Sequence, residues 1–316
     1  MNYTLKNDSL LVTISSLGAE VQSVKNVLSG EELWWNGDPA YWHGHSPILF
    51  PACGGLWNGK YTYNSKWYEM PKHGFAKKMQ FNTSPGGETV QTVQEGTKVI
   101  SFILEGNEET AKVFPFKWRL TITYTLLESQ LQCEAKVENL GDETMHYQLG
   151  GHPALALPDY PFEDKDSITP DTTIGYLKPM HLAPGMTAQS LSVIRAGEQG
   201  CWSPERYHVT LCKENGMIPV NVETFRNEAL IYDGAQLHGF QLYRADGETP
   251  VAEVFFDAPA CLVWQMTDLL CPYVCIEPWY GLPDRQQCTM PLDYRPYSLH
   301  TMPHEESTHF LWGISF

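Results

Sequence analysis

Apolar and polar residues alternate along much of the chain. Between residues 118 and 139 the apolar positions recur at every second residue on both sides of a polar pair, Glu128-Ser129: Leu120, Ile122, Tyr124 and Leu126, then Leu131, Cys133, Ala135 and Val137. Successive side chains of a strand point to opposite faces, so this period indicates strands with one buried face. The stretch predicts a long hairpin, and residues 60–70 predict a second hairpin that turns at Asn64-Ser65.

Shorter alternations predict further strands, separated by turn sequences such as ADGET. These strands cover residues 10–15, 19–25, 99–105, 207–212, 239–243, 251–256 and 261–266. Helical periodicity is nearly absent, and residues 222–234 (VETFRNEALIYDG) are the best candidate for one short helix. No repeat, charge block or linker divides the chain. We therefore expect an all-β protein, a large antiparallel β sandwich with few short helices that forms a single domain over residues 1–316.

The net charge of the chain limits the classes of partner that we expect. The 316 residues include 37 Asp and Glu but only 21 Lys and Arg, a formal net charge of −16. Nucleic acids and anionic membrane surfaces select for basic patches, so we expect neither as a partner. Only 18% of the residues are charged, whereas 10 Trp, 16 Tyr and 13 Phe supply many aromatic rings. This balance suits a neutral polyhydroxylated ligand, although we interpret most of the N-terminal tryptophans as packing residues: Trp34, Trp35, Trp42, Trp57 and Trp67.

The cysteines and the N-terminus indicate a cytoplasmic protein. The first 16 residues (MNYTLKNDSLLVTISS) lack the apolar core and cleavage site of a secretion signal, and no apolar window approaches the roughly 18 residues of a membrane span. The eight cysteines are scattered without any CxxC pair. We therefore expect free thiols, with Cys271 and Cys275 buried, and no disulfide.

Three titratable side chains lie beside Gly or Pro in otherwise apolar segments. They are His73 in MPKHGFAKK, His152 in YQLGGHPALALP and Glu277 in PYVCIEPWYG. On a strand, Glu277 shares a face with Tyr273 and Cys275, and burying its carboxylate there costs free energy unless something pairs with it. Taken singly, each histidine also fits a structural role and Glu277 fits a charged strand edge. Only the fold can bring the three segments together.

Two groups of histidines are weaker candidates for a metal site. The C-terminal group, beside Glu305 and Glu306, consists of His300, His304 and His309. Pro303 argues against a helix that would place an i, i+4 pair on one face, and His43 and His45 lack a third ligand. We expect no metal. The absence of GxSxG, HExxH, P-loop and dinucleotide-binding sequences removes the best support for a serine hydrolase, metalloprotease, kinase or dehydrogenase.

Six segments occur in the order seen in aldose 1-epimerases: HSPILFP, HGFAKKMQF, VFPFKW, GGHPALALP, LVWQM and VCIEPWYG. With LGAEVQSV and ELWWNGDPAYW near the start and HFLWGISF at the end, the chain resembles this family over essentially its whole length, and most closely its bacterial galactose-mutarotase-like branch. The resemblance implies a β supersandwich and interconversion of the α and β anomers of a free aldose, without a cofactor. It implies that Glu277 is the base, His152 the acid and His73 a second histidine that orients the sugar oxygens. An apolar, Trp-flanked setting would raise the pKa of Glu277 and make it a better base.

The resemblance says less about the sugar. Lys77 stands where relatives often carry Arg, and Trp279 either borders the sugar or packs beside it. The family's substrate-binding aspartate has two alternative counterparts, Glu228 and Asp233 in NEALIYDG. The arginines that a related branch uses for hexose 6-phosphates are absent from the expected places. We therefore expect an unphosphorylated hexose or pentose, bound by a monomer or a homodimer.

Three other functions are alternatives. A non-catalytic sugar-binding or sensor protein would keep the same sandwich, and a hexose-6-phosphate mutarotase would keep the same chemistry. A glycoside hydrolase or lyase would need a second carboxylate facing Glu277, for which Asp257 and Asp268 are available.

Overall fold

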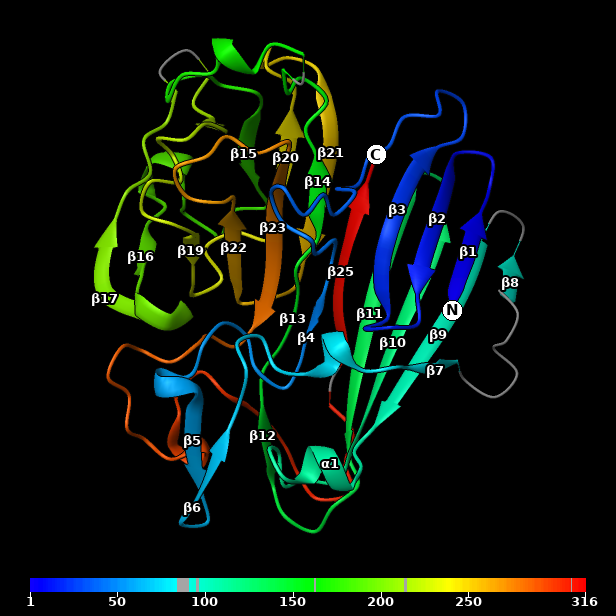
Figure 1. Ribbon diagram of the computed structural model, residues 1–316, viewed down its shortest axis with the longest axis vertical. Coiled ribbons are helices and arrows are strands. Elements are labelled where there is room, and N and C mark those ends of the chain that lie inside the picture. The colour runs from blue at the N-terminus through cyan, green and yellow to red at the C-terminus, as the bar shows by residue number, and fades with distance from the viewer. Residues whose placement is uncertain (84–90, 95–96, 162, 213–214, 308) are drawn as a thin grey trace.

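Antiparallel strands dominate the architecture of the computed structural model, which describes residues 1–83, 91–94, 97–161, 163–212, 215–307 and 309–316 (Figure 1). The expected all-β supersandwich is confirmed. A small N-terminal sheet has the order β1-β2-β3: β1 (Asn2–Lys6), β2 (Leu10–Ser15) and β3 (Glu20–Asn26).

The largest sheet among the described residues has the order β18-β15-β20-β21-β25-β11-β10-β9-β7, with β8 paired to β9. Its strands are β7 (Asn82–Thr83), β8 (Gln91–Gln94), β9 (Thr97–Glu105), β10 (Trp118–Leu127), β11 (Gln130–Asn139), β15 (Tyr176–Met180), β18 (Ile218–Pro219), β20 (Gly239–Tyr243), β21 (Pro250–Phe256) and β25 (Phe310–Ser315). The long predicted hairpin is confirmed, because β10 and β11 pair in register and bury every second residue.

A second large sheet carries the candidate site. Its order is β17-β16-β19-β22-β23-β13-β4, with β14 also paired to β23. The strands are β4 (Ile48–Leu49), β13 (Leu149–Gly151), β14 (Ala154–Ala156), β16 (Val193–Ala196), β17 (Trp202–Tyr207), β19 (Leu230–Tyr232), β22 (Ala260–Trp264) and β23 (Tyr273–Tyr280). Val263 and Ile276 of this sheet share one hydrophobic core with Phe240, Val254 and Trp312 of the largest sheet. The two sheets therefore form the layers of a sandwich.

The N-terminal sheet covers the other half of the largest sheet, where Figure 1 shows β1, β2 and β3 lying across β9, β10 and β11. The rings of Tyr3 and Phe102 meet edge to face at 5.4 Å, and the hydroxyl of Tyr124 donates to the carbonyl of Ala19 over 2.7 Å. Apolar and aromatic contacts thus continue the core beneath this third layer.

Two short ladders and a few helical turns complete the described structure. The ladders are β5 (Lys60–Tyr63) with β6 (Lys66–Glu69), which confirms the second predicted hairpin, and β12 (Met145–Tyr147) with β24 (Leu299–Thr301). The helical turns are α1 (Glu108–Ala111) and the 3-10 turns η1 (Trp57–Gly59), η2 (Ala76–Lys78), η3 (Lys165–Ser167), η4 (Ala188–Ser190), η5 (Glu198–Gly200) and η6 (Leu292–Tyr294). None of the helices in the described ranges is long and apolar enough to cross a membrane.

The strand predicted at residues 207–212 is wrong. The strand of this region, β17, ends at Tyr207, which pairs with Val193, the first residue of β16. Among the described residues, no partner strand therefore lies beside residues 208–212 to continue the ladder.

The helix predicted at residues 222–234 is also wrong. The side chain of Asn221 accepts a hydrogen bond from the amide of Thr224 over 2.9 Å, and Glu228 adopts a left-handed φ of 64°. Both features favour turns over a helix. Beyond them, β19 pairs with β16 and β22, so sheet pairing decides the structure of a segment whose pattern also fitted a helix.

Strand β23 confirms the two predicted faces of the segment around Glu277. Val274 and Ile276 point into the shared core, whereas Tyr273 and Cys275 pack in a separate cluster on the opposite face. Glu277 therefore lies on the face of the sheet that is turned away from the main core.

The loop that carries His73 is held against the chain at Phe50. The amides of Phe75 and Ala76 both donate to the carbonyl of Phe50, over 3.0 and 3.1 Å. Gly74 has a φ of +66°, and a Cβ at this position would overlap the same carbonyl oxygen. Glycine is therefore required here both by its backbone conformation and by the close approach of Phe50.

We expect Gly74→Ala to lower the free energy of unfolding more than Gly185→Ala. Gly185 has a φ of +81° but has nothing within 4 Å of its Cβ position, so its substitution carries only the left-handed strain of roughly 1–2 kcal/mol. At Gly74 the overlap with Phe50 adds about 1–3 kcal/mol more. Urea denaturation of both variants measures the difference, and equal losses would contradict the close-approach argument.

Candidate active site

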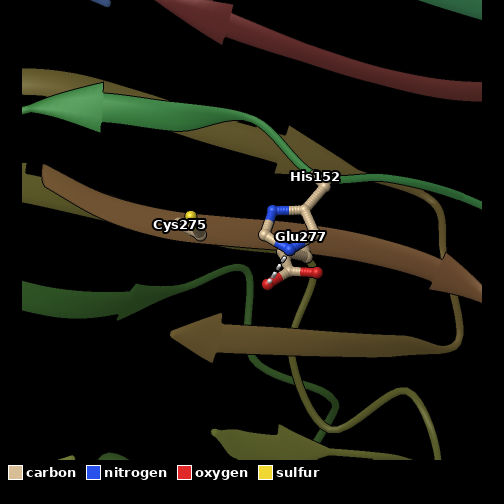
Figure 2. A group of neighbouring side chains, drawn as sticks. All are labelled: His152, Cys275 and Glu277. Carbon is tan, nitrogen blue, oxygen red and sulfur yellow. Dashed lines mark ion pairs between the residues drawn. The ribbon is translucent and has the colours of Figure 1, made fainter. Parts of the chain in front are cut away.

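Glu277 and His152 form a contact between neighbouring strands. Gly150 pairs with Trp279 and Ala154 pairs with Cys275, so the residues between these pairs place His152 opposite Glu277. Nε2 of His152 lies 3.3 Å from Oε1 of Glu277, and the two side chains are 8% and 2% exposed. Figure 2 shows the imidazole reaching from the segment between β13 and β14 to the carboxylate on β23.

The glycines before His152 allow this approach. A Cβ at Gly150 would lie 3.0 Å from both Sγ of Cys53 and the carbonyl oxygen of Pro278, and a Cβ at Gly151 would lie 2.8 Å from the Trp312 ring. A side chain at Gly150 would therefore crowd β23, and one at Gly151 would crowd Trp312 of β25 in the facing layer.

Burial disfavours the charged form of both partners. Loss of solvent raises the pKa of Glu277 well above its usual value, against the lowering effects of the Trp279 hydrogen bond and of Lys72 and Lys77. Loss of solvent also lowers the pKa of His152 to about 3. We infer that the pair keeps one proton over a wide pH range, because both a second proton and the loss of the first would leave a buried net charge.

A second histidine faces this pair. The amide of Gly54 donates to Nδ1 of His73 over 3.1 Å, so in the neutral ring the proton is on Nε2. Burial is the first cause that lowers the pKa of His73 well below its usual value, and the neighbouring His152 is the second. The ring lies 5.6 Å from that of His152 and 5.7 Å from that of Trp279, edge on to both. His73 is therefore a neutral hydrogen-bond donor toward the site.

A cavity of about 340 Å³ opens over these three side chains. Its wall includes the aromatic rings of Trp42, Trp264 and Trp279. Lys72 and Lys77 lie on it as well, and Nζ of Lys77 donates to the backbone carbonyl of Lys72 over 3.1 Å. Burial is the first cause that lowers the pKa of Lys77 to about 8, with Lys78 and Lys72 next. The cavity thus combines hydrogen-bond donors and acceptors with aromatic faces, an arrangement suited to a sugar ring.

Comparison with known proteins identifies the family. A family model described as aldose 1-epimerase matches residues 1–178. The structure of a galactose mutarotase related enzyme from Lactobacillus acidophilus is 31% identical, covers 100% of this chain with 97% of its own, and superposes with a TM-score of 0.82. The chain belongs to the aldose 1-epimerase family.

Two further relatives match this chain over nearly its whole length. A galactose mutarotase-like protein from Lactobacillus casei ATCC 334 is 22% identical, with a TM-score of 0.84 and coverage of 100% of this chain and 99% of that one. Protein LacX of Lactococcus lactis subsp. lactis, in its plasmid form, is 26% identical over 97% of both chains. The fold is therefore that of the galactose mutarotase-like proteins.

In this family member, the structure brings together most of the side chains selected from the sequence. His73, His152 and Glu277 line the cavity, and so do Lys77 and Trp279. Trp279 has a packing role too, since its Nε1 donates to Oε2 of Glu277 over 3.2 Å.

The two alternatives for a substrate-binding carboxylate, Glu228 and Asp233, lie in different surroundings. Glu228 lies on the cavity wall. Asp233 accepts a hydrogen bond from Arg206 over 2.6 Å and lies outside the lining residues of the cavity. Glu228 is therefore the better candidate in this member of the family.

The cavity residues that the motif analysis did not select include Trp42, Trp264 and Lys72. Trp42 had been interpreted as one of several packing tryptophans. Trp264 lies in the LVWQM motif and Lys72 lies beside His73, so their positions in the sequence pointed toward the site. Neither residue type by itself indicated a role there.

Among the described residues, one set of three metal-ligand atoms lies within 4.8 Å of one another, from His152, Cys275 and Glu277 (Figure 2). Burial raises the pKa of the Cys275 thiol well above its usual value, so this sulfur keeps its proton. The C-terminal histidines engage acidic residues instead: His304 contacts Asp142 and His309 contacts Glu134, each at 3.0 Å. Cys271 and Cys275 are buried free thiols, as expected.

The raised pKa of Glu277 predicts a pH-dependent cost to stability. The unfolded chain releases this proton near pH 4.5, whereas the folded chain keeps it to higher pH, so the free energy of unfolding falls as pH rises through this window. Glu277→Gln removes the effect. We expect its stability relative to wild type to increase by about 1.4 kcal/mol for each pH unit above 4.5, until the folded pKa is passed.

Urea denaturation at several pH values measures this difference. The exposed Glu248→Gln is the matched control and should stay parallel to wild type. A constant offset for Glu277→Gln would show that the carboxyl titrates normally in the fold.

Proposed function

We propose that this chain is an aldose 1-epimerase, an isomerase that opens and recloses the ring of an aldose by general acid–base catalysis. The observation that carries the proposal is the 3.3 Å contact between Nε2 of His152 and Oε1 of Glu277 on the wall of an aromatic cavity. The anomeric hydroxyl oxygen and the ring oxygen are both bonded to C1. An acid and a base that act on these two oxygens must therefore be close neighbours.

During ring opening, Glu277 gains one proton and His152 loses one. The carboxylate of Glu277 takes the proton from the anomeric hydroxyl, and Nε2 of the protonated His152 gives a proton to the ring oxygen. The C1–O5 bond breaks as the C1=O1 bond forms, which gives the open aldehyde. After rotation about C1–C2, the reverse transfers close the ring on either face.

The buried pair suits this cycle because it keeps its proton count. The reaction starts with the proton on His152 and a charged Glu277, and the open form leaves the proton on Glu277 and a neutral His152. These are two arrangements of the same single proton, so neither end of the step adds net charge to the buried site. His73 supports the step by donating its Nε2–H to a sugar oxygen.

We propose an unphosphorylated hexose or pentose as substrate. The aromatic rings accept the apolar face of the sugar, and Glu228 accepts hydrogen bonds from its hydroxyls. We further propose that residues 1–316 act as one domain, as a monomer or homodimer. A cytoplasmic location is also part of the proposal, because buried free thiols such as those of Cys271 and Cys275 suit a reducing compartment.

The glycoside hydrolase alternative loses the two aspartates that the sequence offered as its second carboxylate. Asp257 accepts hydrogen bonds from the hydroxyl of Tyr280 and the amide of Leu311, and Asp268 is exposed. Neither aspartate is among the residues that line the cavity. A sugar-binding protein without activity uses the same cavity, so the assay below also tests that alternative.

We expect the wild-type protein to accelerate mutarotation of freshly dissolved α-D-glucose or α-D-galactose, followed by polarimetry or anomeric proton NMR. Glu277→Gln should lower kcat about 10²–10⁴-fold, the usual contribution of a general acid or base. The exposed Glu248→Gln should keep wild-type activity. A folded protein that binds a panel of free and 6-phosphorylated aldoses without accelerating any of them would be a sugar-binding protein.

Glu228→Gln should raise KM about 3–30-fold with little effect on kcat. A hydrogen bond to a charged acceptor contributes roughly 1.5–3 kcal/mol, and at this exposed position competition from water lowers that contribution. Asp233→Asn is the contrasting variant, since Asp233 is engaged with Arg206. A larger KM change for Asp233→Asn would reverse the assignment.

A further inference from the structure

The ring of His152 is oriented without a hydrogen bond to its second nitrogen. Nδ1 is buried and has no hydrogen-bond partner among the described residues. Functional imidazoles usually fix their plane and tautomer by donating this second N–H to a carbonyl or carboxylate. Another contact must therefore hold the ring of His152 against Glu277.

Aromatic rings surround His152 instead. Trp42 stacks on its face, with ring centroids 4.7 Å apart and planes inclined by 25°. Trp264 and His73 meet it edge on, at 5.8 Å and 82° and at 5.6 Å and 77°. Of these three rings, the indole of Trp42 is the one that stacks face to face on the imidazole.

We propose that Trp42 is a positioning residue for His152, whose indole face fixes the imidazole plane and favours the protonated ring that serves as the acid. The inference rests on the proposed acid–base function of His152. An aromatic face carries negative charge density and attracts a cation that lies over it, most strongly where water is excluded. Trp42 thus opposes the desolvation that lowers the pKa of His152.

Apart from a backbone interaction of His152 itself, which raises its pKa, no other group among the described residues around the ring acts in the same way. Glu277 attracts the imidazolium but is the base that must itself lose a proton. Lys72 and Lys77 both lower the pKa of His152, and neutral His73 lies edge on to it. Cys275, within 4.8 Å, keeps its thiol proton. The Trp42 face is therefore the neighbour that favours the charged imidazole without taking part in proton transfer.

The loop around Trp42 is built to hold the indole in this place. The amide of Trp42 donates to the carbonyl of Asp38 over 3.0 Å, and its own carbonyl accepts from Nε1 of Trp35 over 2.7 Å. A Cβ at Gly44 would overlap Cζ2 of Trp42 and lie 2.7 Å from Cε2. Gly44 has no left-handed φ, so the indole of Trp42 is the reason for glycine at this position.

Three variants separate positioning of His152 from other roles. Trp42→Leu removes the aromatic face, Trp42→Phe keeps a smaller one, and Gly44→Ala displaces the indole without substituting any residue that lines the cavity. Trp67→Leu, at a tryptophan that is 67% exposed on β6, is the control. The readouts are kcat and KM for mutarotation and the ¹⁵N NMR shifts of His152, which report its protonation without substrate.

We expect Trp42→Leu to lower kcat about tenfold, the size of a desolvated cation–π contact, with a smaller change in KM. In a pH titration, the ¹⁵N shifts of His152 should report protonation at a lower pH than in the wild-type protein. Trp42→Phe should restore most of both properties, and Gly44→Ala should reproduce part of the loss. In the Trp42→Leu background, Gly44→Ala should have no further effect, because its target is gone.

Unchanged ¹⁵N shifts in folded Trp42→Leu would overturn the proposal, and so would a loss confined to KM, which would make Trp42 a sugar contact only. If Trp42→Leu does not fold, Gly44→Ala and Trp42→Phe decide, and wild-type shifts and kcat in both would overturn it. Failure of the proposed function is distinct, since wild-type protein would then not accelerate mutarotation while the ¹⁵N shifts still report on Trp42.

Discussion

The contact between His152 and Glu277 is the constraint on which the site depends. Each group alone would be costly to bury in charged form, and the pair avoids this cost by sharing one proton. This requires the two atoms to remain 3.3 Å apart inside a wall that excludes most water. The strands, glycines and aromatic rings around the pair can all be understood as consequences of that requirement.

The sheet provides the separation through its register. His152 falls opposite Glu277 because the pairs on either side of them, Gly150 with Trp279 and Ala154 with Cys275, are in one antiparallel register. Side chains directly opposite on neighbouring strands share a face and lie close together. A slip of one residue would turn the imidazole to the core face, so the acid–base geometry is as well defined as the strand pairing itself.

Much of this architecture was predictable from local pattern. Strict alternation predicted the hairpin of β10 and β11 and placed Glu277 on the face opposite Ile276. The pattern failed where pairing partners decide the outcome. Residues 208–212 alternate like a strand, but no strand of the described chain lies beside them. Residues 222–234 have a pattern that also fits a helix, but Leu230–Tyr232 pair with β16 and β22 instead.

The proximity of His73, His152 and Glu277 could not be derived from the residues alone, because no short sequence pattern shows the register in which distant strands pair. It came from the family resemblance, and the geometry agrees with it. Trp42 illustrates the opposite case. Its loop sequence, WHGHSP, contains a glycine whose need becomes visible only when the indole lies against it, so neither residue type nor spacing distinguished Trp42 from a packing tryptophan.

Placement of the shared proton is then a balance among neighbours of different kinds. Burial favours the neutral arrangement, with the proton on Glu277, over the charged arrangement from which the reaction starts. Lys72 and Lys77 favour the carboxylate of Glu277 but oppose the imidazolium of His152, so they act mainly on the number of protons in the pair. The indole face of Trp42 acts on His152 alone, because it is stacked on that ring. An aromatic face can thus move a proton between two buried groups without adding charge to the site, which no lysine or carboxylate in the same cavity could do.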